Sequence, residues 1–588
     1  MTYPRPDRQR ERWMSLDGPW EFEFDPDDIG IKKGWHLKRL SETIRVPYCV
    51  QSEASGLGFE KICPVFWYGK QFPRTALPEG TRFFLNFGAV DYEADVWING
   101  NRLGGHRGGY TPFSFEITDF LEDTNRISVR VADYPTKRTL RGKQYIYRRL
   151  SAVFYTPVSG IWQPVFIHST GDSSVANLLL LPDMDRVTVR ADIDARTAAS
   201  CEVGITDADG TPVVREKLPI EGNRVEKEFI IKNPRRWSPE HPHLYRVQLT
   251  LSDGRGGVSD RVTAFTGLRR VETKEGRILL NGKPVYLKML LVQGYYPKGH
   301  YTPGDEAEFE REIIRYKSLG FNGVRMHEKI EDPRYLYYCD RHGLLLWEEM
   351  PSPFLFGGLD EKQYERELAE VLDRDACHPS VMTVVLFNET WGIYGLLWSA
   401  KKRQFLASMY RKVKDFNPGI LVVDNSGYDH LMTDIADIHH YLNTDRKIHD
   451  LYRILGDKKK MSRQFLRLPK TVVNIVSTHV VGRRPYLRQG IFRGEEPFVI
   501  SEFGGAGYYK GAGDFMENFR RNVRIMLEYP VITGYCLTQA YDVENEKNGL
   551  LNFDRSEKYP ARAVRAINEM FTEKDSTNRK NRDASSRR

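Results

Sequence analysis

The feature that most constrains the fold is a change of pattern after Gly267-Leu268-Arg269, where short apolar runs begin to alternate with segments of helical period. Eight of these runs can be assigned as strands: residues 284–290, 322–326, 344–350, 381–389, 420–426, 434–441, 497–503 and 533–542. Several are almost continuously apolar, as is typical of parallel strands buried on both faces. In the intervening segment DPRYLYYCDRHG, Pro333 and Gly343 mark the expected ends of a helix. Eight strand–helix units predict a (β/α)8, or TIM, barrel, in which functional side chains lie at the carboxyl ends of the strands.

The chain before this change has the pattern of β-sandwiches. Between Trp20 and Ile167 short alternating strands such as FFLNFG and ADVWING follow one another, and Asn99-Gly100 is a strong signal for a two-residue hairpin. This stretch predicts a jelly-roll sandwich, and the similar stretch that follows it predicts an immunoglobulin-like sandwich. We therefore expect a jelly-roll domain at 1–169, an immunoglobulin-like domain at 170–268, a barrel at 269–572 and a disordered charged tail at 573–588.

The formal net charge of +8 raises the question of a nucleic-acid partner. The excess lies in two segments: residues 457–470 carry six positive charges and one negative, and residues 573–588 carry six positive and three negative. The rest of the chain is balanced, so we expect no nucleic-acid partner. The segment 457–470 lies in the connection between the sixth and seventh predicted strands, where it could attract an acidic substrate, although a solvated surface is the favoured interpretation.

Other compositional features narrow the class of protein. No signal peptide and no long apolar run is found, which predicts a cytoplasmic protein without a membrane partner. The six cysteines are scattered, which predicts free thiols. The neighbouring His439 and His440 point to opposite faces of a strand and cannot chelate one ion together, so we expect no metal and no cofactor. One of them is instead expected to be a core or sugar-contacting histidine. The sequence leaves open whether the chain forms a homo-oligomer.

Two glutamates stand at the ends of apolar strands. Glu389 ends HPSVMTVVLFNE and Glu502 ends EPFVISE. A carboxylate after such a run is costly to bury, so each is either a functional group or a partner in a structural ion pair. If they converge in the barrel mouth about 5 Å apart, they can cleave a glycosidic bond with retention of configuration.

Several motifs along the chain are together similar to one known family. LDGPWEF, ADVWING, GGYTPFSFEIT, TPVSGIWQPVFI, LLNGKPVYLK, NGVRMHEKIEDPRYLYYCDRHGLLLWEEMP, FNETWG and VISEFGG resemble glycoside hydrolase family 2, the family of β-galactosidases, β-glucuronidases and β-mannosidases. The resemblance runs from about Leu16 to about Phe571. It implies a retaining exo-β-glycosidase that forms a covalent glycosyl-enzyme intermediate on an oligosaccharide or glycoside substrate. It also implies Glu389 as general acid/base, Glu502 as nucleophile and Asn388 as a hydrogen-bond partner of the sugar 2-hydroxyl.

Further residues are candidates for substrate contact. The resemblance implies that Tyr441 hydrogen-bonds the nucleophile, and an aromatic shelf is the alternative. It also places Arg325 near the nucleophile, where an arginine would orient a carboxylate, and a structural ion pair is again the alternative. The remaining candidates stand at the predicted strand exits, where each could contact a sugar: His327, Glu328, Trp391 and Asp424.

Departures from the family pattern leave the sugar open. Gln293 stands where β-galactosidases have histidine, and Leu537, Thr538 and Gln539 stand where the family usually has a tryptophan. Gln293 and Gln539 are nevertheless candidates for substrate binding. The β-glucuronidase pattern has N-x-K directly before a glycine. Here Asn545-Glu546-Lys547 is followed by Asn548 before Gly549, so the register is off by one residue.

The resulting hypothesis is an exo-β-glycosidase acting on a neutral β-galactoside-type residue. The alternatives are a β-glucuronidase, an exo-acting β-galactofuranosidase or arabinosidase, and a non-catalytic carbohydrate-binding protein. A pure binding protein would have no chemical reason to retain two carboxylates at two strand ends.

Overall fold

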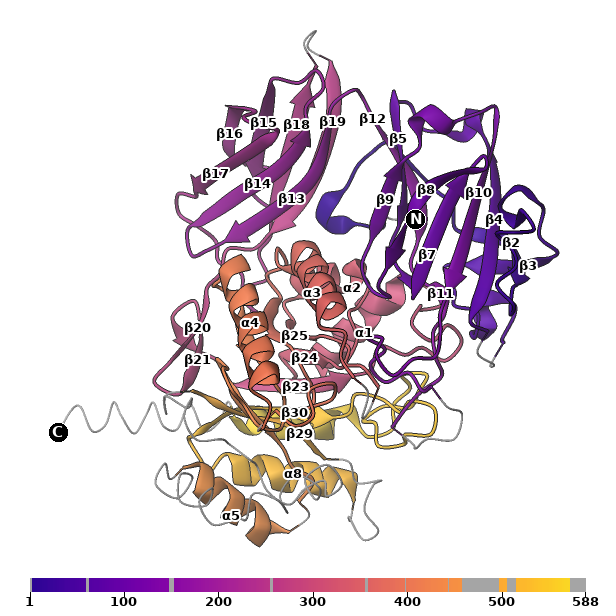
Figure 1. Cartoon of the computed structure of the whole chain (residues 1–588). Helices are drawn as coiled ribbons and strands as arrows, with labels where there is room; N and C mark the ends of the chain where they lie inside the picture. Colours follow the sequence, from indigo (N-terminus) through magenta and orange to yellow (C-terminus); the bar gives the residue numbers. More distant parts are fainter. Residues whose placement is uncertain are drawn as a thin grey trace.

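The computed structural model describes residues 3–59, 63–146, 153–253, 257–354, 358–396, 398–442, 444–456, 496–504 and 514–571. Figure 1 shows two β-sandwiches above a body of parallel strands and helices. The basic segment 457–470 and the charged tail 573–588 lie outside the described residues. Within the described ranges, no helix is both long enough and apolar enough to cross a membrane. All six cysteines are free thiols.

The first sandwich packs a four-stranded antiparallel sheet on a six-stranded one. The four-stranded sheet has the order β1 (Trp13–Ser15), β12 (Val165–Thr170), β5 (Arg82–Phe87) and β9 (Phe113–Glu116). The six-stranded sheet has the order β3 (Glu42–Val46), β2 (Gly18–Phe24), β4 (Val65–Pro73), β10 (Thr124–Ala132), β7 (Glu93–Ile98) and β8 (Asn101–Arg107). Asn99 and Gly100 have φ angles of 49° and 81° and join β7 to β8, which confirms the predicted hairpin.

The second sandwich has seven strands in two sheets. One sheet contains β13 (Ser174–Pro182), β14 (Arg186–Asp194) and β17 (Arg224–Ile230). The other contains β16 (Pro212–Pro219), β15 (Ser200–Thr206), β18 (Tyr245–Ser252) and β19 (Val258–Thr266). In β18 every second side chain is buried, as the alternating sequence YRVQLTLS predicts. Three short strands, β20 (Val271–Lys274), β21 (Arg277–Leu280) and β22 (Lys283–Pro284), then lead into the barrel.

The barrel is a nearly closed sheet of eight parallel strands, all of them predicted. In chain order the strands are β23 (Leu287–Val292), β24 (Gly323–Met326), β25 (Leu345–Glu349), β26 (Val381–Val385), β27 (Leu421–Val423), β28 (Ala436–His439), β29 (Phe498–Gly504) and β30 (Ile532–Thr538). The sheet order is β27-β26-β25-β24-β23-β30-β29-β28. Its pairs are parallel and its strands are almost wholly buried, which explains their continuously apolar sequences.

Six described helices connect the strands and lie around them (Figure 1). They are α1 (Ala307–Ser318), α2 (Pro333–His342), α3 (Glu361–Asp375), α4 (Ala400–Phe416), α5 (Asp445–Leu455) and α8 (Phe515–Met526). Helix α2 begins with Pro333 after the N-cap Asp332 and ends at Gly343, whose φ is 71°. The helix ends predicted from the sequence are therefore confirmed.

The fourth strand is shorter than expected. We expected it to continue to Glu389, but β26 ends at Val385. Backbone hydrogen bonds persist beyond it, from Leu386 to Val423 and from Glu389 to Ser426. However, Glu389 has a φ of 48°, in the left-handed region, so the chain turns out of the strand there. Glu389 thus stands on a turn above the strand end.

A long loop of the first sandwich reaches the mouth of the barrel. Gly142 N donates a hydrogen bond of 2.9 Å to Ser352 O in the β25–α3 connection. On the far side of the loop, the Tyr155 hydroxyl donates to the Glu546 carboxyl in the segment after β30. The first sandwich therefore forms part of the wall around the carboxyl ends of the barrel strands.

Candidate active site

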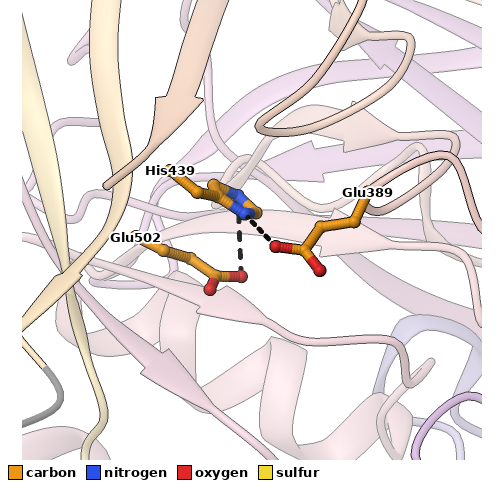
Figure 2. A group of neighbouring side chains, drawn as sticks. All are labelled: Glu389, His439 and Glu502. Atoms are coloured by element: carbon orange, nitrogen blue, oxygen red, sulfur yellow. Dashed lines mark hydrogen bonds and ion pairs between the residues drawn. The ribbon is translucent and has the colours of Figure 1, made fainter. Parts of the chain in front are cut away.

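The two strand-end glutamates converge at the barrel mouth (Figure 2). Glu389 lies after β26 and Glu502 lies in β29. One carboxyl oxygen of each and one ring nitrogen of His439 lie within 4.8 Å of one another. Two carboxyl groups at about 5 Å have the separation that a retaining glycosidase requires, because the nucleophile must reach the anomeric carbon while the acid reaches the leaving oxygen.

Arg325 contacts Glu502 and orients its carboxyl group. Its buried guanidinium donates from Nη1 to Glu502 Oε1 at 3.1 Å and from Nε to Glu349 Oε2 at 2.6 Å. Burial alone would raise the pKa of Glu502, but the positive charges of His439 and Arg325 lower it below the usual range of a glutamate. Glu502 is therefore ionised at neutral pH.

Two further predicted residues join this group. The Tyr441 hydroxyl donates to Glu502 Oε2 at 2.5 Å. Burial, and then the charge of Glu502, raise the pKa of Tyr441 well above its ordinary value, so the phenol keeps its proton and remains a donor. Asn388 Oδ1 accepts from Arg325 Nη2 at 2.9 Å, which places the amide beside the two glutamates.

His327 and Glu328 lie at the exit of β24. His327 Nδ1 is 3.1 Å from Glu349 Oε1, and burial lowers the pKa of His327 in spite of that neighbouring carboxylate. Only 1 % of Glu328 is exposed. Burial, more than any nearby charge, raises the pKa of Glu328 to about 8, so this carboxyl group is mostly protonated at neutral pH and can donate a hydrogen bond.

Gln293 and Gln539 form a chain of amides at the ends of β23 and β30. Gln293 Nε2 donates to Gln539 Oε1 at 2.8 Å, and Gln539 Nε2 donates to Asn548 Oδ1 at 2.9 Å. Asn548 Nδ2 in turn donates to Glu546 Oε1 at 3.2 Å. Lys547, which lies between Glu546 and Asn548 in the sequence, is exposed, and its backbone oxygen accepts a hydrogen bond from Lys558 Nζ at 3.0 Å.

The structure does not bring Asp424 and Trp391 into this group. Asp424 is fully buried, where Oδ1 pairs with His430 Nδ1 at 2.7 Å and Oδ2 accepts the backbone N–H of Leu431. Its oxygens therefore hold the loop after β27. The Trp391 ring stacks on Phe154 of the first sandwich, with ring centroids 5.5 Å apart, so it serves as a contact between domains.

Sequence reasoning did not single out His439 among the two histidines, and it missed Glu349 as a member of the site. His439 Nδ1 lies 2.9 Å from Glu389 Oε1, whereas His440 points outward, with Nε2 2.7 Å from the Tyr452 hydroxyl. The opposite directions of the two histidines were predicted, but not which of them faces the glutamates. Glu349 follows Glu348 in the strand LLLWEEM, and both side chains are buried. No signal in the sequence shows which of the two glutamates faces the site.

Glu389, His439 and Glu502 also have the side-chain types of a metal-ligand set. The guanidinium of Arg325 stands beside them, with Nη1 3.1 Å from Glu502 Oε1 and 3.2 Å from His439 Nε2. A fixed positive charge at that distance opposes a second cation. The arrangement therefore suits an acid and a nucleophile better than a metal ion.

Two family models match the chain. The sugar binding domain of glycosyl hydrolases family 2 matches residues 13–169, and a second domain of glycosyl hydrolases family 2 matches residues 178–269. A β-galactosidase of Thermoanaerobacter pseudethanolicus is 29% identical over 393 residues, which cover 64% of this chain and 50% of the relative. A β-glucuronidase of Canis lupus familiaris is 26% identical over 440 residues, which cover 66% of this chain and 65% of the relative. The chain thus spans between about half and two thirds of the length of these relatives.

A solved structure shares the fold over nearly the whole chain. The β-glucuronidase of Ruminococcus gnavus in complex with D-glucuronic acid has a TM-score of 0.73 and 20% sequence identity, and the match covers 95% of this chain and 98% of that one. The order of two sandwiches and a barrel is therefore common to both. The two matching family models and the named relatives support glycoside hydrolase family 2 as the family of this chain, and the solved structure supports the fold.

Proposed function

We propose that the chain is a retaining exo-β-glycosidase. The observation that carries this proposal is the pair of carboxyl groups at the barrel mouth, with oxygens of Glu389 and Glu502 within 4.8 Å of one another. Support also comes from Arg325 and Tyr441, which donate to the two oxygens of Glu502 and hold it as an ionised nucleophile.

The reaction follows from these positions. Glu502 attacks the anomeric carbon as the bond from that carbon to the glycosidic oxygen breaks, and Glu389 gives its proton to the departing oxygen. The sugar is then esterified to Glu502, whose negative charge has disappeared. Glu389, now a carboxylate, takes a proton from water, and the resulting hydroxide equivalent attacks the anomeric carbon and releases Glu502.

We further propose a neutral β-galactoside-type residue as the sugar. The chain of Gln293, Gln539 and Asn548 offers uncharged donors and acceptors in the part of the mouth between β23 and β30. Lys547, which would have to hold a uronate carboxylate, is exposed, and Glu546 beside it is buried and would repel a carboxylate. A β-glucuronide is the second candidate, because the relatives and solved structures that resemble this chain include β-glucuronidases.

A panel of 4-nitrophenyl glycosides tests both statements: β-galactoside, β-glucuronide, β-glucoside, β-mannoside, β-galactofuranoside and α-L-arabinoside. We expect the highest kcat/KM on the β-galactoside and loss of turnover in Glu502→Gln. Highest kcat/KM on the glucuronide, reduced by Lys547→Ala, would overturn the choice of sugar. Absence of Glu502-dependent turnover on every member would overturn the glycosidase proposal.

A further inference from the structure

His439 stands between the two glutamates, at the end of β28 (Figure 2). Its Nδ1 lies 2.9 Å from Glu389 Oε1, and its Nε2 lies 3.5 Å from Glu502 Oε1. The side chain is 4% exposed. One imidazole ring therefore contacts both groups that would carry out the chemistry.

The backbone around the ring is shaped to hold it there. Gly427 has a φ of 80°, and a Cβ atom on it would collide with the imidazole ring of His439. Only glycine leaves room for the ring and adopts this φ without strain. On the preceding residue, Ser426, the Oγ atom lies 3.2 Å from His439 Nε2. The loop after β27 therefore fixes both the position and the rotation of the ring.

The hydrogen bonds around the ring show which nitrogen carries a hydrogen. The Ser426 hydroxyl donates to Asp437 Oδ2. Burial alone would raise the pKa of Asp437, but the hydrogen bond to His430 and nearby positive charges lower it below its ordinary value, so this carboxylate accepts. Since the hydrogen of Ser426 is used there, Ser426 Oγ accepts from His439, and Nε2 carries a hydrogen.

Arg325 does not change this assignment. Its Nη1 is 3.2 Å from His439 Nε2, but it also donates to Ser501 O and Glu502 Oε1, each at 3.1 Å. The two hydrogens of Nη1 are therefore used by oxygens. With Nε2 protonated, Nδ1 is the nitrogen that holds or releases a proton, and Glu389 Oε1 faces it at 2.9 Å.

We propose that His439 is a positioning residue that shares one proton with the carboxyl group of Glu389, so that the imidazole and carboxyl act as one acid/base pair. This inference rests on the proposed glycosidase function. In the first half of the reaction the shared proton leaves the pair for the glycosidic oxygen, so that Nδ1 is left without a hydrogen and Glu389 is left as a carboxylate. In the second half the pair regains the proton that water gives up.

The charges around the ring favour retention of the shared proton. Burial would lower the pKa of His439, but the charge of Glu502, followed by the hydrogen bond and charge of Glu389, raises it above the ordinary value, against the effect of Arg325. The ionisable groups that face the ring from the surrounding strands and loops, or adjoin it on its own strand, are Arg325, Glu389, Tyr428, Asp437, His440 and Glu502. Esterification of Glu502 removes the largest of the effects that raise this pKa, so the pair releases its proton more readily once the intermediate has formed.

The first experiment compares His439→Gln with the matched control His440→Gln on phenyl and 2,4-dinitrophenyl glycosides of the preferred sugar. The poor leaving group needs the proton and the good one does not. We expect His439→Gln to lower kcat/KM by about 10- to 100-fold on the phenyl glycoside and by less than about 3-fold on the dinitrophenyl glycoside. In the pH profile of kcat/KM for the phenyl glycoside, the alkaline limb of His439→Gln should lie about one pH unit below that of the wild type. An unmoved limb, or the same shift in His440→Gln, would overturn the proposal.

The second experiment needs no turnover. In protein labelled with [13Cε1]histidine, the NMR signal that is missing from His439→Gln identifies this residue, and its pKa is measured in the wild type and in Glu389→Gln. We expect the pKa of His439 to fall in Glu389→Gln, because the partner that shares the proton has lost its charge. An unchanged pKa overturns proton sharing. A lowered pKa in a protein that hydrolyses no glycoside would support proton sharing and reject the glycosidase function.

Discussion

At the scale of single residues, Glu389 and Glu502 have different environments and should respond differently to mutation. Glu502 is held by Arg325 and Tyr441, and in the proposed mechanism no other group can take over its covalent role. We expect Glu502→Gln to abolish turnover of activated aryl glycosides. Glu389→Ala should retain turnover of a dinitrophenyl glycoside, which departs without a proton, and added azide should raise its rate by attacking the glycosyl-enzyme. Steady-state rates with and without azide check both statements, and near-normal turnover in Glu502→Gln would contradict the assignment.

Also at the residue scale, Glu328 makes stability depend on pH. Its pKa is raised from 4.5 to about 8 in the folded protein, mainly by burial. Between these values the folded state holds a proton that the unfolded state has lost, so stability falls as pH rises through this window. Glu328→Gln removes this titration. In a series of thermal unfolding measurements, the Tm of Glu328→Gln minus the Tm of the wild type should rise from pH 5 to pH 8. If this Tm difference is independent of pH, Glu328 is charged in the folded protein.

At the scale of elements, the start of helix α2 depends on one side chain. Asp332 Oδ1 accepts the backbone N–H of Arg334 at 2.9 Å, and Oδ2 pairs with Arg334 Nη2 at 2.7 Å. Asp332→Ala removes both the cap and the ion pair, so we expect the free energy of unfolding to fall by about 2 kcal/mol. Asp332→Asn is the matched control, because the amide oxygen can still cap the helix. Calorimetric Tm values should fall in the order wild type, Asn, Ala; equal values for Asn and Ala would show that the charge, and not the cap, matters.

At the scale of the whole molecule, the first sandwich supports the floor of the barrel mouth. The hydroxyl of Tyr155 donates to Glu546, and the chain of hydrogen bonds continues through Asn548 and Gln539 to Gln293. Tyr155→Phe removes the first link and should raise KM by about 3- to 10-fold with a small change in Tm. Tyr134→Phe, at an exposed tyrosine of the same domain, is the control. If KM is unchanged in Tyr155→Phe, the domains are coupled by packing alone.

The sequence by itself determined the features that depend on near neighbours. Side-chain period and backbone preference within a few residues explain three features: the alternation of buried and less buried side chains in β18, the turn at Asn99, and the ends of α2 at Pro333 and Gly343. The eight barrel strands were recognisable because burial on both faces demands continuous apolar runs. The motifs at Glu389 and Glu502 then predicted two functional residues near strand ends, since a carboxylate is costly to place there, and their roles stay a prediction.

Only the tertiary structure decided which side chains meet. His439 is 50 residues from Glu389, and closure of the barrel brings them to 2.9 Å, a contact that no local pattern encodes. The same folding turns Asp424 inward to hold a loop and covers Trp391 with Phe154 from another domain. The strands and the residues near their carboxyl ends could be assigned from the sequence because continuous apolar runs are a local feature, although β26 is shorter than expected. The partners at those ends could not, because each depends on the direction of a side chain and on a neighbour that arrives from a distant part of the chain.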